Sequence, residues 1–184
     1  MAVQQHLVAA IGDERGTGAA DRLCEACVEL FEVDAAAISV VFDGINKGTL
    51  GASRPPARVY DELQFTLGEG PCLDSVAHRA PVIVVDLADP SEDRWPAYGS
   101  AMLGHHIRSV FAMPVVVAGE YLGALDLFRA APGVLAAEEL AGALLAAELA
   151  ELPLLDLIGA DVRAAVENPD SNAWAELNVL LRSN

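Results

Sequence analysis

The chain has 184 residues, of which 53% are apolar, and its formal net charge is −16. This length suits one ordinary domain plus a tail and is too short for two full cores. Lysine and arginine together number only 11. Because neutralising phosphates requires these residues, the composition argues against direct binding of RNA or DNA.

The N-terminal sequence and the cysteines indicate a cytoplasmic protein. MAVQQHLVAAIGDERG lacks the basic start and the continuous apolar core of an export signal. Three cysteines, an odd number, favour reduced thiols over a disulfide framework. The longest apolar segment, residues 135–158, carries four glutamates, a proline and an aspartate. We therefore expect no membrane-spanning helix.

The first elements are a helix and a strand pair. Apolar residues at helical spacing predict a helix over residues 21–31, after a flexible stretch at residues 12–18. Residues 36–42 are AAISVVF, which predicts a strand. Asp43-Gly44 favours a turn into a second strand near residues 49–52.

A glycine turn lies in the middle of the chain. Residues 59–67 are predicted to form a short helix or an extended connection. Gly68 and Gly70 allow backbone angles closed to other residues, and Pro71 fixes the first turn of the next helix. The β-branched run at residues 82–85 predicts a strand covered on both faces.

An acidic loop and a hairpin follow. Residues 86–93 are expected to cap the next element, a helix over residues 95–106. Residues 107–117 and 121–128 are predicted strands of an antiparallel hairpin, because only three residues separate them. The chain is therefore predicted to be an α+β protein, with an antiparallel sheet of five or six strands flanked by helices.

The C-terminal part is predicted to be helical. Residues 136–158 form one long helix kinked at Pro153, and a last helix covers residues 173–181. The long helix has apolar residues on more than one face, and such a helix usually packs against a partner. We expect a homodimer through the first, long and last helices. The leucines concerned are Leu140, Leu144, Leu145, Leu149 and Leu152.

Four segments in this order resemble a GAF domain. They are QFTLGEGPCLDSV (64–76), PVIVVDLADPSEDRWPAY (81–98), IRSVFAMPVVVAGEYLGALDLFRAAPG (107–133) and EELAGALLAAELAELPLLDL (138–157). More narrowly, they resemble the actinobacterial type in which a GAF domain precedes an RNA-binding ANTAR domain. The ending AWAELNVLLRSN resembles the linker helix into that module, which is itself absent from these 184 residues.

The resemblance implies the domain organisation and the function. Residues 1–16 would be an N-terminal extension, residues 17–160 the GAF domain, and residues 161–184 a linker helix toward the ANTAR domain. Such proteins are signal-responsive transcription antiterminators. This chain would be their non-enzymatic sensory half, which binds a small ligand or transmits a dimer state. RNA would be bound only through the ANTAR module.

We expect a ligand pocket, if there is one, to be lined by apolar side chains near the acidic loop. The alternative is that the same residues fill an ordinary core. No catalytic residue, metal site or cofactor is predicted. The candidate lining residues are Phe42, Phe65, Val85, Trp95, Tyr98, Phe111 and Met113.

The cysteines leave a redox alternative open. Cys72 follows Pro71 at a helix start, where the helix dipole can lower the pKa of a thiol, or it packs beneath the turn. Free methionine sulfoxide reductases, which resemble GAF domains, have a cysteine in this turn but need a resolving cysteine that this chain lacks after residue 72. Cys24 and Cys27 supply half a zinc shell and are expected to pack in the core.

The sequence carries weaker signals for two further functions. Asp86, Asp89 and Asp93 could hold a metal, but their capping role explains them equally well. Cyclic-nucleotide GAF domains carry an Asn-Lys-x-Phe-Asp-Glu signature, whereas here Asn46-Lys47 precedes Gly-Thr. A purely structural dimerisation module without a ligand is the remaining alternative.

Overall fold

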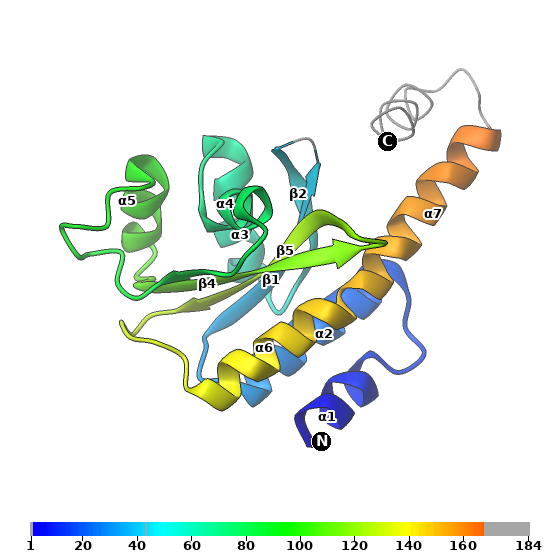
Figure 1. Ribbon diagram of the computed structural model, residues 1–184, viewed down its shortest axis with the longest axis horizontal. Coiled ribbons are helices and arrows are strands. Elements are labelled where there is room, and N and C mark those ends of the chain that lie inside the picture. The colour runs from blue at the N-terminus through cyan, green and yellow to red at the C-terminus, as the bar shows by residue number, and fades with distance from the viewer. Residues whose placement is uncertain (1, 43, 168–184) are drawn as a thin grey trace.

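The computed structural model describes residues 2–42 and 44–167, and its centre is a five-stranded antiparallel sheet between two groups of helices (Figure 1). The strand order is β2-β1-β5-β4-β3. This arrangement confirms the predicted α+β class. The strands are β1 (Ala35–Phe42), β2 (Ile45–Ala52), β3 (Val82–Val84), β4 (Ser109–Val117) and β5 (Glu120–Arg129).

The helices divide between the two sides of the sheet (Figure 1). One side, here called the helix-bundle face, carries α1 (Ala2–Ile11), α2 (Gly16–Leu30), α6 (Ala137–Leu149) and α7 (Glu151–Glu167). The other side, here called the α3–α5 face, carries α3 (Pro55–Leu67), α4 (Pro71–His78) and α5 (Pro96–Gly104).

Successive side chains of each strand point to opposite faces of the sheet, so the strands contribute apolar residues to a core on each face. In β4, Phe111 and Met113 pack into the core beneath α2 and α6, whereas Val110 and Ala112 pack with α3 and α5 residues on the other side. All four are fully buried. The predicted hairpin is confirmed, since β4 and β5 pair in antiparallel register.

The N-terminal region is more helical than predicted. The helix predicted over residues 21–31 is confirmed, but it begins at Gly16, so the flexible stretch was wrong from that residue on. A further helix, α1, precedes it and buries Leu7 and Ile11. Its short apolar pattern, AVQQHLVAAI, gave too weak a periodic signal to predict it.

The segment before the glycine turn is a helix. Helix α3 begins at Pro55 rather than near residue 59, because proline lacks only an N–H that the first helical turn does not use. The strand predicted over residues 82–85 is shorter, and the prediction that it is covered on both faces was wrong at Val85, which is 46% exposed. The reason is that β3 lies at the edge of the sheet.

The predicted long C-terminal helix is two helices. Helix α6 ends at Leu149 and α7 begins at Glu151, one turn before the predicted kink. Pro153 has no N–H for the Leu149 carbonyl and its ring crowds that group, so the break falls near residue 150. The helix predicted over residues 173–181 lies outside the described residues. None of the described helices is long and apolar enough to cross a membrane.

Candidate functional site

Polar side chains are buried between the sheet and helices α3 and α4. Two of them are aspartates, Asp61 of α3 and Asp126 of β5, here called the acid pair, and both are fully buried. Burying an aspartate is costly unless its oxygens are hydrogen-bonded. The other buried members of this cluster are Ser39, Asn46, Gln64 and Cys72.

Local structure brings the acid pair together. Ser39 and Asp126 each take an inward position in strands whose other inward residues are apolar, on the α3–α5 face. In the ladder, Asp126 pairs with Ala37, two residues from Ser39. Asp61 and Gln64 stand three residues apart in α3, so both side chains project from one helix face.

Neutral donors hold the two carboxylates. The Gln64 side-chain amide donates to Asp126 Oδ2 at 2.7 Å and to Asp61 Oδ1 at 3.4 Å. The Ser39 hydroxyl donates to Asp61 and lies 3.4 Å from Asp126 Oδ2. The Thr49 hydroxyl also donates to Asp61. Within the described residues, no lysine or arginine makes a salt bridge to the pair.

Burial changes the protonation of the acid pair. Loss of water raises the pKa of Asp61, although its hydrogen-bond donors lower it. Burial and the neighbouring Asp61 together raise the pKa of Asp126 well above its ordinary value. The pair therefore retains a proton at pH values where an exposed aspartate is ionised.

Two buried polar atoms on the α3–α5 face, one of them in the acid pair, lack a hydrogen-bond partner among the described residues. Asp126 Oδ1 and the Tyr98 hydroxyl are both buried without one among the described residues. Burial raises the pKa of Tyr98 well above its ordinary value, and Asp126, Cys72 and Asp61 raise it further. Buried polar groups without a partner are rare in native proteins, and a bound water or ion can account for them.

The glycine turn connects the three helices that cover the acid pair. Gly70 has φ +151° and packs so closely on Gln64 that a Cβ there would overlap its side chain. The Gln64 side-chain oxygen Oε1 accepts from the Cys72 N–H at 2.9 Å, at the start of α4. Glu69 accepts from the N–H groups of Ala97 and Tyr98, at 2.7 and 2.9 Å, at the start of α5.

The capping prediction for the acidic loop was therefore wrong. Asp86 and Asp89 accept from the N–H groups of Ala88 and Ser91 and cap turns within the loop itself. Helix α5 is instead capped by Glu69, which is remote in sequence. Sequence distance hid this contact, because a capping carboxylate is normally sought next to the helix it caps.

Cys72 is buried beneath the turn, in surroundings that disfavour the thiolate. Its N–H bonds Gln64, and its sulfur lies 3.3 Å from the Asn46 side-chain amide, a donor to it. Burial, followed by Asp126 and Asp61, raises its pKa well above that of a free thiol, opposite to the effect expected of a helix start.

The other two cysteines lie on the helix-bundle face. Cys24 and Cys27 are fully buried there, which confirms core packing. Burial raises the pKa of Cys27 to about 12. All three cysteines are free, and the Cys72 thiol faces the opposite side of the sheet from the other two.

The acidic loop carries an ion pair. Arg108 donates two hydrogen bonds to Asp86, both at 2.6 Å, and these lower the pKa of Asp86 to about 2. Asp89 bonds Ser91 in the loop. Within residues 2–42 and 44–167, no group of three His, Cys, Asp or Glu side chains could hold a metal ion.

The structure does not bring the seven predicted lining residues together. Trp95 and Tyr98 are buried on the α3–α5 face. Phe111 and Met113 are buried on the opposite face. Three lie elsewhere: Phe65 and Val85 are 54% and 46% exposed, and Phe42 lines a groove.

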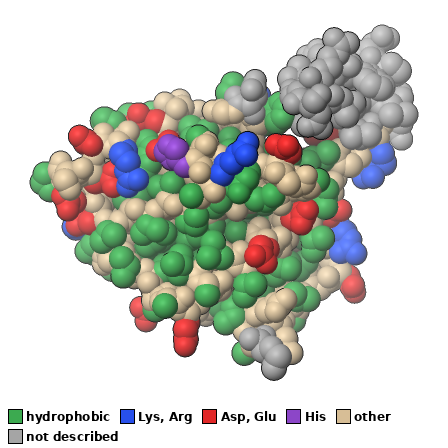
Figure 2. All heavy atoms as spheres, viewed as in Figure 1, with side chains coloured by type: hydrophobic (Ala, Val, Ile, Leu, Met, Phe, Trp, Pro, Cys, Tyr) green, Lys and Arg blue, Asp and Glu red, His purple; other side chains and the backbone are tan. Residues whose placement is uncertain are grey.

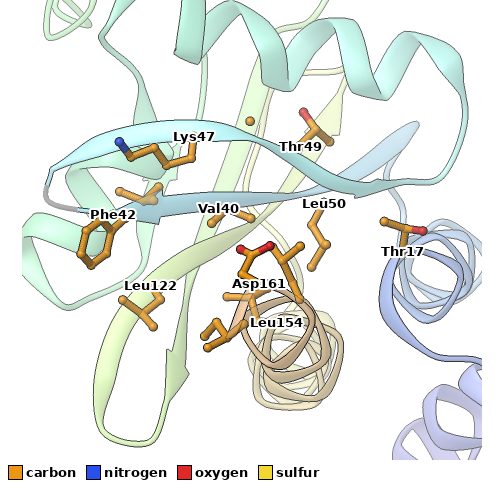
Figure 3. A pocket seen from close by; sticks show the side chains of 13 residues that line it. Thr17, Val40, Phe42, Lys47, Thr49, Leu50, Leu122, Leu154 and Asp161 are labelled. Atoms are coloured by element: carbon orange, nitrogen blue, oxygen red, sulfur yellow. The ribbon is translucent and has the colours of Figure 1, made fainter. Parts of the chain in front are cut away.

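That groove lies between the β1–β2 hairpin, β5 and α7, and is here called the α7 groove (Figure 3). Its volume is about 600 Å³. The Asp161 carboxylate points from α7 toward β1 (Figure 3). A concave, largely apolar space of this size with few polar groups is typical of a small-ligand site. Aliphatic walls come from Val40, Leu50, Leu122, Leu154, Leu157 and Ile158.

The outer side of α6 and α7 exposes apolar residues. Leu144, Leu152 and Leu155, here called the leucine stripe, are 39%, 52% and 43% exposed. The opposite side of these helices buries Ala143, Ala146 and Leu154 in the core. Figure 2 shows hydrophobic side chains at the surface on the side where these helices run. The two-sided character predicted for the long helix is confirmed.

Sequence reasoning missed the acid pair. The available signal was a single polar residue inside each of two apolar strand patterns, Ser39 in AAISVVF and Asp126 in GALDLF. The partner Asp61 gave no signal, because an aspartate in an amphipathic helix is normally exposed.

Comparisons with known proteins agree on one family. The model of the GAF domain family matches residues 17–152. No curated protein matches the chain.

Three solved structures share the fold at low sequence identity. A GAF domain from an Acinetobacter phosphoenolpyruvate-protein phosphotransferase is 12% identical, with a TM-score of 0.64 over 82% of this chain and 89% of that one. A domain of a protein assigned as a two-component sensor histidine kinase from Sinorhizobium meliloti is 17% identical, with a TM-score of 0.59 over 83% and 95%. The type II free methionine-R-sulfoxide reductase from Thermoplasma acidophilum is 17% identical, with a TM-score of 0.54 over 82% and 93%.

Proposed function

The chain belongs to the GAF domain family, and from that premise we propose that it is a non-enzymatic sensory domain that passes its state through α7 to an RNA-binding ANTAR module. GAF domains are typically sensory or regulatory. The four motifs that resemble the actinobacterial GAF–ANTAR type support the narrower assignment. In this proposal residues 17–160 are the sensor and residues 161–184 the linker helix.

The observation that carries the proposal is the double role of α7. Its inner side is anchored in the core by Leu154, which is 1% exposed, and it lines the α7 groove. Its outer side carries Leu152 and Leu155 of the leucine stripe. Helix α7 therefore has two apolar surfaces. One faces the sheet, and the other is available to a partner. A change on either side alters the packing of the helix that leads to the output module.

We propose that the partner is a second copy of this chain. Exposed leucines along a helix favour burial against another apolar helix surface. The same helix face in a second copy supplies such a surface, as expected for a symmetric homodimer. With a net charge of −16, contacts to RNA are left to the ANTAR module.

A small apolar ligand in the α7 groove is a second candidate input, favoured by the groove's volume of about 600 Å³. Phe42, one of the predicted lining residues, lies at this groove. An occupant would contact the hairpin and α7 together. It would therefore act on the same helix that carries the leucine stripe.

The enzyme alternative has less support. The sulfoxide reductase from Thermoplasma acidophilum shares the fold, and fold alone does not fix function. The Cys72 thiol is buried with a raised pKa. Cys24 and Cys27 lie on the helix-bundle face, on the opposite side of the sheet from Cys72. A thiol of this kind is a poor nucleophile.

Dimerisation through the leucine stripe is tested by sedimentation of the wild-type chain and the double variant Leu152→Glu/Leu155→Glu. We expect a dimer for the wild type and a monomer with unchanged circular dichroism for the variant. Val134→Glu, at a residue that is 65% exposed and lies before α6, is the matched control and should remain a dimer.

The proposal fails if the wild type is monomeric throughout the micromolar range, or if the double variant dimerises as strongly as the wild type. In a protein that also carries the ANTAR module, the double variant should weaken RNA binding while the Val134→Glu control does not. Equal RNA binding by both would remove the link between dimer state and output.

A further inference from the structure

We infer that the α7 groove is the docking site for residues 173–181 of this same chain. The inference deepens the proposed function by naming what regulates α7, and it rests on that function only for its biological role. Docked in the groove, the segment holds the path to the output module against the sensor. Its release frees that path.

The groove presents apolar side chains that are incompletely covered. It lies between the β1–β2 hairpin, β5 and α7, and its volume is about 600 Å³. Of the lining residues, Leu154 is 1% exposed, whereas Leu122, Leu157 and Ile158 are only partly buried. Apolar side chains around such a concavity are stabilised by burial against a further apolar surface.

The wall that α7 contributes has the pattern of a helix-packing surface. Leu154 and Ile158 stand four residues apart, and Leu157 and Asp161 complete the set at positions i+3 and i+7. Residues at this spacing share one side of a helix. The wall is about 10 Å long, at a rise of about 1.5 Å per residue. Grooves of this kind bind amphipathic helices through anchors at the same spacing.

Residues 173–181, AWAELNVLL, carry a matching pattern. Trp174, Leu177 and Leu181 stand at positions i, i+3 and i+7, which predicts a helix with one apolar side. Such a helix of nine residues is about 13 Å long, close to the length of the α7 wall. The segment therefore has the anchors and the length that the groove requires.

The connection to α7 allows the segment to return to the groove. Helix α7 ends at Glu167, six residues after Asp161, and residues 168–172 separate it from Ala173. Antiparallel helices are typically joined by about two to five residues. Pro169 within this connection disfavours continuation of the helix, so the sequence favours a reversal of the chain.

The charges permit this contact. Among the described lining residues, Lys47 is the one base and Asp161 the one acid. Residues 173–182 likewise carry one acid, Glu176, and one base, Arg182. Because neither surface has a net charge, they can meet without repulsion in a chain whose net charge is −16.

Two rival occupants are the same segment of a second copy and a small apolar molecule. The tether favours the segment of the same chain, because a short linker gives an effective concentration of the order of millimolar. A segment from a second copy has no such advantage. Its docking depends on protein concentration, which separates the two cases by experiment.

The test is acrylamide quenching of Trp174 fluorescence in the 184-residue chain. The other tryptophan, Trp95, is 5% exposed, and a Trp174→Phe variant measures its signal alone for subtraction. We expect Trp174 to be quenched several-fold less than free N-acetyltryptophanamide. The protection should be equal at low and high protein concentration, because docking within one chain is independent of concentration.

Two variants introduce charge into the groove from different elements. Ile158→Glu alters α7 and Leu122→Glu alters β5. Both side chains are only partly buried, so each variant should keep its circular dichroism while Trp174 quenching rises toward that of the free compound. A folding defect in one variant leaves the other to decide. The control is Leu152→Glu/Leu155→Glu, on the outer side of α7, which should keep Trp174 protected.

The inference is overturned if wild-type Trp174 is quenched as fully as the free compound, as expected for an empty groove or one that holds a small molecule. Protection that grows with protein concentration, or that disappears in the control, would assign the segment to a second copy and also overturn it. Unchanged quenching in both groove variants would place Trp174 elsewhere. Sedimentation measures the dimer and quenching measures the docking, so their failures are separate results.

Discussion

The two faces of the sheet are built from alternate residues of the same strands, yet they have different interiors. On the helix-bundle face, β5 contributes Leu125 and Leu127 to one continuous aliphatic core. On the α3–α5 face, the same strand contributes Ala124, Asp126 and Phe128, and the apolar residues there form two separate clusters. The polar cluster lies in the same interior. The helix-bundle face is therefore stabilised mainly by apolar packing. On the α3–α5 face, hydrogen bonds and the protonation of buried aspartates also contribute to stability.

The largest expected effect tests the packing of the helix-bundle face. Phe111→Ala leaves a cavity beneath α2 and α6, and we expect the free energy of unfolding to fall by about 3–5 kcal/mol. Urea denaturation measures this loss. Phe65→Ala is the matched control on the α3–α5 face, where the ring is 54% exposed and its loss should change stability by well under about 1 kcal/mol. Similar losses in both variants would contradict the burial of Phe111.

The next effect tests the hydrogen bonds of the α3–α5 face. Gln64→Ala removes the donor to Asp126 and the acceptor of the Cys72 N–H, so we expect a loss of about 2–3 kcal/mol. A double-mutant cycle with Asp126→Asn measures how much of this loss runs through the acid pair. Strict additivity of the two substitutions would show that Gln64 and Asp126 are not coupled.

A third prediction distinguishes the faces by pH. The pKa of Asp126 is raised in the folded state, so its stabilising contribution is full below the unfolded value of about 4 and is lost as pH rises through the folded value. Each unit of elevation corresponds to about 1.4 kcal/mol. Asp126→Asn cannot ionise, so its stability relative to wild type should increase from about pH 4 to pH 8.

Urea titrations of both proteins across that pH range check the prediction. Leu125→Ala, on the helix-bundle face of the same strand, serves as the control, because its loss should not depend on pH. A constant difference between Asp126→Asn and wild type across the range would show that Asp126 is ionised in the folded protein.

The smallest effect tests the cap on α5. Glu69→Gln keeps an acceptor oxygen for the Ala97 and Tyr98 N–H groups but removes the negative charge at the helix start. We expect a loss of about 0.3–1 kcal/mol that shrinks as salt is added. Thermal denaturation at low and high salt measures it. A loss that is independent of salt would show that the charge itself contributes nothing.

Local patterns made the fold predictable, and remote contacts limited what could be predicted of the site. Strands β1, β4 and β5 follow from apolar runs bounded by turn residues, so their positions were found within about two residues. The break near residue 150 was displaced because a proline acts on the carbonyl four residues before it. The strand patterns correctly placed Phe111 and Met113 together, but could not show that Trp95 and Tyr98 lie across the sheet from them.

The acid pair could not be predicted from the sequence, because its contacts join residues that are remote in sequence. Asp61 meets Ser39 across 22 residues of sequence and Gln64 meets Asp126 across 62. A pattern of a few residues carries no information about such pairings. Glu69, 28 residues from the helix start that it caps, was missed in the same way.

The turn from Gly68 to Pro71 has a mechanical consequence for the cover of the acid pair. Gln64 on one side of the turn holds the start of α4, and Glu69 within it holds the start of α5. The backbone amides of Cys72, Ala97 and Tyr98 thus donate to two side chains that are only five residues apart. We expect loosening of this turn to release the starts of α4 and α5 together, so the three amides should exchange with solvent at similar rates.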